Sequence, residues 1–220
     1  NQKNAPFFIA RSIHAQYRPG VEAQPNVDKA RQAIAAYQKV LEQEPNNDEA
    51  YNALVYLYRQ IKDEDKERQF LEARARDGAP EKRAQALTVL ASKQWNCSYQ
   101  ITEQKDVKSN ATENGKTVIK YKKPAQVEDF EQAKKCTTEG LKLAEQAISL
   151  DSNSEQAWSF KTNLLLEMTK LAEMDGNTEA KTEYEKQYQA AQQRTQQLND
   201  INKQKREEEE KAKAAKEAAS

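Results

Sequence analysis

Apolar residues recur at helical spacing along most of the chain, and residues 27–45 show this pattern most clearly. Six residues of this segment lie at positions i, i+3, i+4, i+7, i+10 and i+11: Ala30, Ala33, Ile34, Tyr37, Val40 and Leu41. This spacing places all six on one face of an α-helix. The prolines fall between such periodic segments, as expected of residues that end helices. The pattern therefore predicts an all-α protein.

A degraded internal repeat adds to this picture. Residues 40–54 (VLEQEPNNDEAYNAL) are similar to residues 147–161 (AISLDSNSEQAWSFK). In each copy a turn with Asn follows the first helix, and the next helix opens with an acidic residue, an alanine and a large aromatic, Tyr51 or Trp158. A repeated helix-turn-helix unit cannot bury its apolar face alone, so it stacks on copies of itself. The self-similarity predicts a row of stacked helical hairpins.

Residues 30–60 also carry two signatures of a known helical repeat. Four positions have the small, aromatic, small and proline residues, at the right spacing, of the second helix of the tetratricopeptide repeat: Ala33, Tyr37, Val40 and Pro45. Three more stand where the first helix of that repeat carries Trp, Leu and Tyr: Tyr51, Leu54 and Tyr58. The chain thus resembles tetratricopeptide-repeat proteins over roughly residues 5–190. The resemblance implies a right-handed superhelical stack of helix-turn-helix repeats.

The spacing of the proline position sets the expected domain organisation. Pro80 follows Pro45 by 35 residues, close to the period of about 34 in this family. Ser152 takes the next proline position 72 residues later, which leaves room for one repeat and 38 additional residues. We therefore expect a solenoid of about three to four repeats at residues 1–190, with an irregular insertion at 98–135 inside the third repeat.

The insertion differs in pattern from the rest of the chain. Short segments on both sides of Asn114-Gly115, a strong tight-turn signal, alternate in β fashion. We expect a small mobile loop or hairpin, after which helical character resumes at Gln126 and the second helix starts early. The polar composition of residues 98–125 predicts that they bury little and are dispensable for folding. Residues 191–220 are nearly free of apolar residues, so we expect a long charged C-terminal helix that caps the stack and ends in a tail.

The alignment to the repeat also implies a disulfide bond between Cys97 and Cys136. It ends the first helix of the third repeat near Trp95 and begins the second helix near Cys136, so both cysteines lie at the base of the insertion. A disulfide favours an extracytoplasmic location, whereas the alternative is two buried reduced thiols in a cytosolic protein. The sequence opens at Asn1 and not at Met, as expected after removal of a leader. We expect a bacterial, exported protein that is periplasmic or secreted, with a cytoplasmic location left open.

Charge and hydropathy argue against two classes of partner. The chain has 35 basic and 35 acidic residues, and this zero net charge gives no reason to expect nucleic acid as a partner. Its mean hydropathy is −1.07, and no apolar run approaches the ~18 residues of a membrane span, so we expect no membrane insertion. The basic cluster KYKKP at 120–124 would suit nucleic acid or an acidic partner, but a solvated loop is the favoured interpretation.

We find no set of residues with the pattern of a catalytic or metal site. His14 is the single histidine and has no nearby cysteine, while either metal binding or general-base chemistry normally needs a partner group. The two cysteines lack metal-ligand spacing, and the five scattered glycines form no phosphate-binding loop. We therefore expect no enzyme activity, no cofactor and no metal.

The family resemblance implies a non-catalytic scaffold that binds a peptide or protein in a groove lined by the first helix of each repeat. The positions carried over to this groove are Asn52, Tyr56, Arg59, Gln60, Leu87, Ala91, Gln94, Trp95, Ser159, Asn163 and Glu167. Among them we expect Tyr56, Arg59 and Trp95 to contribute most, because aromatic and Arg side chains dominate interface energies. For Trp95 the alternative is packing under the insertion.

A second hypothesis assigns a structural role. In this hypothesis the protein is an assembly factor of the bacterial cell envelope and acts through its insertion or its charged C-terminal helix. The fold admits many ligands, so the sequence does not identify the partner.

Overall fold

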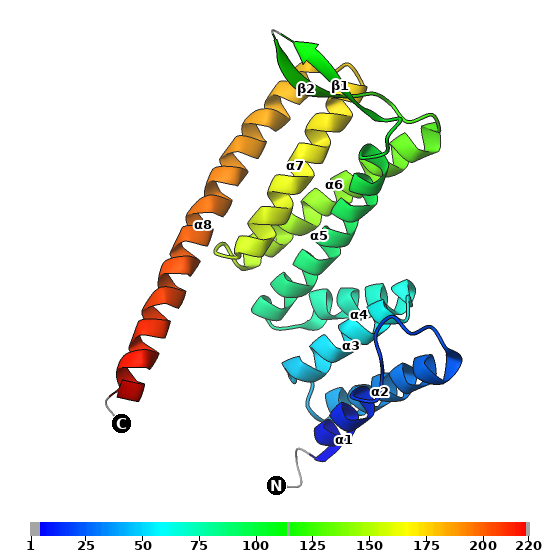
Figure 1. The fold of residues 1–220 in the computed structure, drawn as a ribbon, viewed down its shortest axis with the longest axis vertical. Coiled ribbons are helices and arrows are strands. Elements are labelled where there is room, and N and C mark those ends of the chain that lie inside the picture. The colour runs from blue at the N-terminus through cyan, green and yellow to red at the C-terminus, as the bar shows by residue number, and fades with distance from the viewer. Residues whose placement is uncertain (1–4, 114, 219–220) are drawn as a thin grey trace. The chain divides into compact units, whose positions relative to one another are not determined.

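The computed structural model describes residues 5–113 and 115–218 and is built almost wholly of helices (Figure 1). Over these residues the elements are α1 (Ala5–His14), α2 (Gln24–Gln43), α3 (Asp48–Gln60), α4 (Glu64–Asp77), α5 (Pro80–Thr102), β1 (Lys108–Glu113), β2 (Lys116–Tyr121), α6 (Val127–Leu150), α7 (Glu155–Met174) and α8 (Thr178–Ala218). The predicted all-α class is confirmed, with one small antiparallel hairpin in the described chain. The residues divide into two compact units, Asn1–Ala73 and Arg74–Ser220.

The first unit is built around the residues that carry the repeat signature. Its core consists of Ala10, Tyr17, Ala30, Ala33, Ile34, Tyr37, Val40, Ala50, Leu54, Leu57 and Tyr58. Small residues such as Ala33 and Ala50, both fully buried, let the helices approach closely, and the tyrosines fill the remaining space. Asn47 caps α3, because its side chain accepts a hydrogen bond from the Ala50 amide at 3.0 Å.

In the second unit, α5, α6, α7 and α8 run alternately up and down (Figure 1). Helix α5 packs against both α6 and α7, and α8 packs along α7. Leu164 and Leu165 are fully buried at the centre of α7. Gly140 of α6 makes the close approach possible, since a Cβ atom there would lie 2.9 Å from the Cβ of Gln94.

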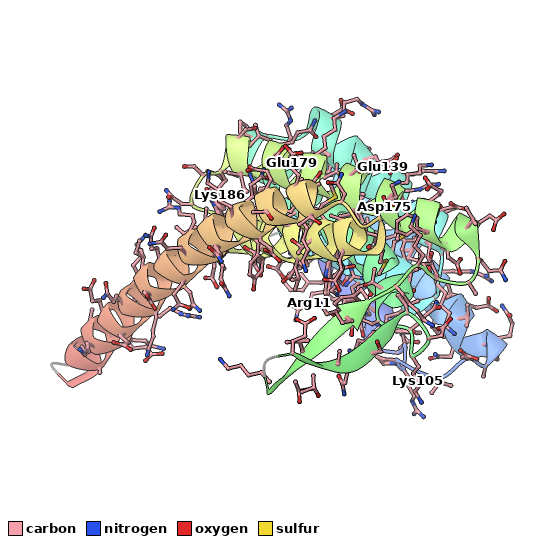
Figure 2. The ribbon with its side chains drawn as sticks, turned by 90° about the horizontal axis from the view of Figure 1, so that it is seen from above. Arg11, Lys105, Glu139, Asp175, Glu179 and Lys186 are labelled. Atoms are coloured by element: carbon pink, nitrogen blue, oxygen red, sulfur yellow. A yellow bond between two sulfur atoms is a disulfide. The ribbon has the colours of Figure 1, made fainter. Side chains whose placement is uncertain are left out.

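A tight turn separates α7 from the long, charged helix α8. Gly176 has φ +69°, which suits glycine, and the Asn177 side chain accepts a hydrogen bond from the Ala180 amide at 3.0 Å. Helix α8 then continues without a break past residue 190, where composition alone had suggested a boundary. It is held on α7 as far as Asn202, whose amide donates to Glu155 at 2.9 Å. Charged side chains such as Glu179 and Lys186 cover its surface (Figure 2).

One expectation about the insertion is wrong and one is met. Helix α5 continues past Trp95 to Thr102, so the irregular segment is shorter than 98–135. Helix α6 begins at Val127, next to Gln126, where the sequence predicts that helical character resumes. The hairpin pairs Lys108 with Tyr121 and Glu113 with Lys116; Gly115 has φ +74°, while its predicted turn partner Asn114 lies outside the described residues. The inserted chain is therefore mostly regular structure.

The close helix contact at Gly140 gives a test of the packing. We predict that Gly140→Ala lowers the free energy of unfolding by ~1–3 kcal/mol, although alanine alone favours a helix by about 1 kcal/mol over glycine. The new methyl group meets the Cβ of Gln94, which cannot move unless α5 moves. Urea denaturation measures the change, with Thr138→Ala at an exposed position of α6 as the control. An increase in stability for Gly140→Ala would contradict this packing.

Candidate partner-binding surface

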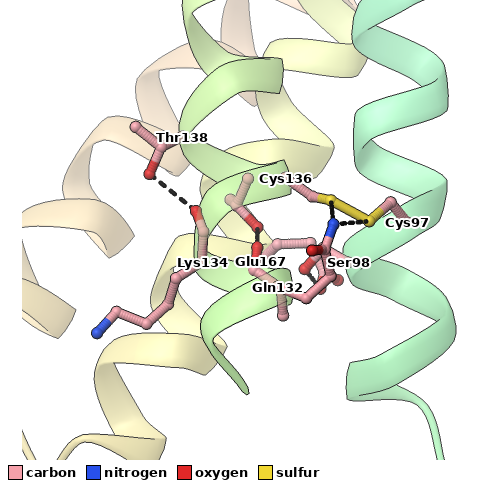
Figure 3. Close-up of a disulfide and its surroundings, with 9 residues drawn as sticks. Cys97, Ser98, Gln132, Lys134, Cys136, Thr138 and Glu167 are labelled. Carbon is pink, nitrogen blue, oxygen red and sulfur yellow. Dashed lines mark hydrogen bonds between the residues drawn. A yellow bond between two sulfur atoms is a disulfide. The ribbon is translucent and has the colours of Figure 1, made fainter. Parts of the chain in front are cut away.

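The disulfide lies inside the helical layer of the second unit. Cys97 of α5 and Cys136 of α6 are bonded, with an S–S distance of 2.05 Å and a Cα–Cα distance of 6.1 Å (Figure 3). The amide of Gln132 donates to the Cys136 sulfur at 3.1 Å. The predicted disulfide is thus confirmed, although both cysteines lie within helices and not at the ends of a turn. The bond joins α5 to α6 close to the point where the chain leaves α5 for the hairpin.

One turn from the disulfide, a carboxylate is buried between α5 and α7. The side chain of Glu167 is 1% exposed, and the Ser98 hydroxyl donates to its Oε2 at 2.9 Å (Figure 3). The Thr102 hydroxyl donates to the same oxygen at 2.7 Å. Oε1 of Glu167 accepts from the Lys170 ammonium at 2.6 Å. A buried carboxylate without such partners would cost several kcal/mol, roughly the penalty of an unpaired charge in a protein interior. The two hydroxyls of α5 therefore fix how α5 and α7 are aligned, and the ammonium, which comes from α7 itself, supplies the counter-charge.

Lys170 extends this cluster toward the hairpin. It is 5% exposed and also donates to Glu103 Oε1 at 2.8 Å. Its Nζ lies 5.4 Å from the ring centre of Tyr99 and 5.1 Å from that of Tyr121, within the range of cation–π attraction. The ammonium thus contacts groups from α5, α7 and β2 at once. We call Glu103, Glu167, Lys170, Ser98 and Thr102 the buried charge cluster.

The hairpin is fixed to the helices by backbone and side-chain contacts. The Tyr121 amide donates to Glu173 Oε1 at 3.0 Å, and the Lys122 amide donates to the Val107 carbonyl at 2.9 Å. Val107 is fully buried in a cluster with Phe130 and Leu171. The expectation that residues 98–125 bury little is therefore wrong, and with it the basis for calling them dispensable. This segment supplies Ser98, Thr102 and Glu103 of the buried charge cluster and part of the core.

The acidic groups beside the hairpin are held in their charged forms. Burial by itself would raise the pKa of Glu103, but hydrogen bonds from Lys108 and Lys170 outweigh it and lower the pKa below 4.5. Burial would also raise the pKa of Glu173, but the hydrogen bonds from Lys181 and the Tyr121 backbone outweigh it and lower the pKa below 4.5. Burial would lower the pKa of Lys170, but the charge of Glu167 and the two carboxylate hydrogen bonds raise it. Glu103, Glu173 and Lys170 are consequently charged at neutral pH.

A row of aromatic rings lies on this framework. The Trp95 ring lies 6.1 Å from the Phe160 ring of α7 and 5.0 Å from the Tyr99 ring, and Tyr99 shares the Lys170 ammonium with Tyr121. Tyr99 is 39% exposed, and Trp95, Phe160 and Tyr121 are partly buried. We call Trp95, Tyr99 and Phe160, each of them at least partly accessible, the α5/α7 aromatic face.

The predicted groove positions of the second unit fall into two groups. Gln94, Trp95, Ser159 and Asn163 are partly exposed, but only Trp95 belongs to the α5/α7 aromatic face. Three predicted groove residues are core residues instead: Leu87, Ala91 and Glu167, at 7%, 0% and 1% exposure. Leu87 packs with Ala147 and Ala157, because α5 is covered by α6 as well as by α7. Sequence reasoning missed Tyr99 and Phe160, whose only signal was their aromatic character.

The predicted positions of the first unit all lie on α3. Asn52 and Tyr56 are exposed, and the Tyr56 ring lies 5.7 Å from that of His14 on α1. Arg59 donates through Nε and Nη2 to the buried Glu67 at 3.2 and 3.0 Å, so its guanidinium is already engaged within the unit. Arg59 and Gln60 border a hollow of about 420 Å³ whose apolar lining is Tyr17, Val21, Val27 and Ile61.

His14 is partly buried and contacts Tyr37. Its Nδ1 shares a hydrogen bond of 3.3 Å with the Tyr37 hydroxyl, and burial lowers its pKa below 6.5.

Across the described residues, no group of three His, Cys, Asp or Glu side chains is placed to hold a metal ion. No helix in the described ranges is both long enough and apolar enough to cross a lipid bilayer.

Comparison with known proteins identifies one segment. The family model of the tetratricopeptide repeat matches residues 36–69, which span the second half of α2, all of α3 and the start of α4. The chain therefore contains a tetratricopeptide repeat, as its sequence predicted. No curated protein matches the chain.

The buried charge cluster predicts a large effect of removing its cation. Lys170→Met leaves the Glu167 and Glu103 carboxylates without their shared counter-charge and should lower the free energy of unfolding by ~3–5 kcal/mol. Adding Glu167→Gln to Lys170→Met should restore much of this loss, because the variant no longer buries an unpaired charge there. Urea denaturation compares these variants with Arg31→Met, which breaks an exposed pair and should cost about 0–1 kcal/mol. A loss below about 1 kcal/mol for Lys170→Met would contradict the cluster.

The lowered carboxylate pKa values predict acid sensitivity. A carboxylate with a lower pKa in the folded state stabilises the fold fully above its unfolded pKa, and this contribution is lost as the pH falls through the folded pKa. Stability supplied by Glu103 and Glu173 should therefore be complete above about pH 5 and decline below 4.5. Urea denaturation between about pH 7 and pH 3 checks this, and Glu173→Gln should show a shallower decline. A steeper decline in this variant would be contrary to the assignment.

Proposed function

We propose that this protein is a non-catalytic scaffold that binds a peptide or protein partner, and that the α5/α7 aromatic face of the second unit is a binding surface. The tetratricopeptide repeat at 36–69 supports a protein partner in general. The observation that carries the specific surface is the row Phe160–Trp95–Tyr99, which remains accessible although neighbouring apolar residues are buried. Aromatic side chains of this kind supply most of the binding energy at protein interfaces.

The rigidity of this surface adds to the proposal. Trp95 packs against Ala91, Ala144 and Leu164, and Tyr99 rests over the Lys170 ammonium. The disulfide at Cys97 fixes the same two turns of α5. Side chains that are held in place before binding lose less conformational freedom in the complex, and the affinity rises accordingly. The buried charge cluster would then serve binding by holding the aromatic rings in position.

The first unit offers a second surface for the same role. Asn52, Tyr56 and Gln60 follow one face of α3, and Arg59 stands beside them with its guanidinium tied to Glu67. Tyr56 is the exposed aromatic of this set, at 38%, and rests on the ring of His14. We propose that these α3 residues contribute contacts of their own and that Tyr56 is the strongest of them.

The disulfide informs the location. A bond between Cys97 and Cys136 is compatible with an oxidising compartment. We propose that the protein acts in the bacterial periplasm or outside the cell. The carboxylates and lysines around the bond are engaged in ion pairs with one another, so this region offers a framework and no free general base. Binding without turnover is the function that suits this arrangement.

The proposed surface is tested by removing two rings. A photo-crosslinking amino acid at Tyr99 identifies the partner in native extract, and one at Glu139 of α6 is the control position. With the purified partner, Trp95→Ala combined with Phe160→Ala should weaken binding by about 10-fold or more, since each hot-spot ring contributes ~1–3 kcal/mol. Phe8→Ala removes an equally large exposed ring from the first unit and should leave the affinity unchanged. Full affinity in the double variant, with an unchanged melting temperature, would refute this surface.

A further inference from the structure

The hairpin and its flanks are strongly basic in a protein of zero net charge. Residues 104–123 contain six lysines and two acidic residues, a net charge of +4. The chain as a whole balances 35 basic against 35 acidic residues, so the positive charge is concentrated here and compensated elsewhere. A local excess of one sign attracts partners of the opposite sign, whatever the net charge of the whole protein.

The lysines stand on a fixed support and not on a solvated loop. The amides of Tyr121 and Lys122 are bonded to Glu173 and to Val107, and Val107 and Pro124 are buried. Because the backbone is already ordered, a partner that binds the hairpin pays little of the entropy that a mobile loop would lose. The KYKKP segment is therefore not a solvated loop, because its backbone is ordered by these contacts.

The six lysines divide into two groups of three. Three are neutralised internally: Lys108 pairs with Glu103, Lys120 with Glu113 at 2.7 Å, and Lys123 with Asp175 at 2.7 Å. The other three are exposed and have no ion-pair partner within residues 5–113 and 115–218: Lys105, Lys116 and Lys122. Figure 2 shows Lys105 pointing away from the helices beside the hairpin. The unpaired lysines are the source of the uncompensated charge.

We propose that the hairpin binds an extended acidic segment of a protein partner. The unpaired lysines supply charge complementarity, and a two-stranded sheet leaves an outer edge of each strand without a backbone partner. Ile119, which lies on the same face of the sheet as Tyr121, is 48% exposed and offers an apolar contact between the charges. An acidic segment with alternating apolar residues matches these features, whereas nucleic acid would need a larger uncompensated basic surface.

This inference rests on one part of the proposed function, namely that the partner is a protein. It uses the hairpin edge and its lysines, while the proposed function uses Trp95, Tyr99 and Phe160. Lysines on an edge strand also guard against aggregation, which is the main competing explanation. Protection against aggregation requires no acidic ligand. Removing the lysines should therefore weaken peptide binding if they recognise a ligand, and promote aggregation if they protect the edge.

The test uses the full chain and a fluorescein-labelled ten-residue peptide of alternating Glu and Val. The peptide should bind saturably at low salt and lose affinity as the salt rises from about 0.05 to 0.5 M. Lys105→Gln with Lys116→Gln and Lys122→Gln should weaken binding about tenfold, as expected for three exposed ion pairs. The matched control is Lys39→Gln with Lys142→Gln and Lys186→Gln, which removes the same charge from exposed positions elsewhere and should bind like the natural chain.

Several results would overturn the proposal. Equal binding of a Gln–Val peptide, or equal weakening in the control variant, would show that the hairpin charge is not recognised. Tighter binding of a ten-nucleotide single-stranded DNA would assign the hairpin to nucleic acid. If the hairpin variant aggregates while its peptide affinity is unchanged, the lysines protect against aggregation and do not bind an acidic ligand. The Trp95→Ala, Phe160→Ala variant should keep its affinity for the acidic peptide, so failure of this proposal and failure of the proposed function are separable.

Discussion

The ion pair between Glu167 and Lys170 is the interaction on which the second unit depends. Both groups are almost completely buried, and burial of two charges is repaid only when every hydrogen-bonding position is used. Here Ser98, Thr102 and Glu103 complete the set. Such a pair adds little net stability compared with apolar residues. The alignment of α5 and α7 is set by the hydroxyls of Ser98 and Thr102, which must reach the Glu167 carboxylate. The main consequence is that α5, α7 and the hairpin occupy fixed relative positions.

Those fixed positions create the surface proposed for binding. The disulfide holds α5 on α6, the Ser98 and Thr102 hydroxyls hold α5 on Glu167 of α7, and the Tyr121 amide holds β2 on Glu173. Trp95, Tyr99 and Tyr121 are then carried by elements that cannot move independently. A short repeat protein has a thin core and much exposed surface, so such cross-links compensate for limited apolar burial. Rigidity and accessibility occur together here because the polar groups are buried beneath the aromatic rings.

The sequence predicted the helices and the repeat well, because both depend on local spacing. The buried faces of α2 and α3 follow from Tyr37 and Leu54 at signature positions. The groove residues were predicted less well, since a family template does not show which face of α5 is covered by two neighbours, and Leu87 is buried for that reason. The role of Glu167 was also hidden, because its partner Ser98 lies 69 residues away. Long-range polar pairing leaves no periodic signal.

We propose that the buried charge cluster holds the hairpin and the α5/α7 aromatic face as one rigid framework. Amide hydrogen exchange at Tyr121 and Lys122 measures this rigidity. The Tyr121 amide anchors the hairpin to Glu173, and the Lys122 amide bonds to Val107, whose side chain is buried with Phe130 and Leu171. We predict exchange slowed by about 100-fold or more relative to an unstructured peptide, with the protection lost in Lys170→Met. Exchange of both amides in the natural chain at the rate of an unstructured peptide would show that the hairpin is not held on the helices.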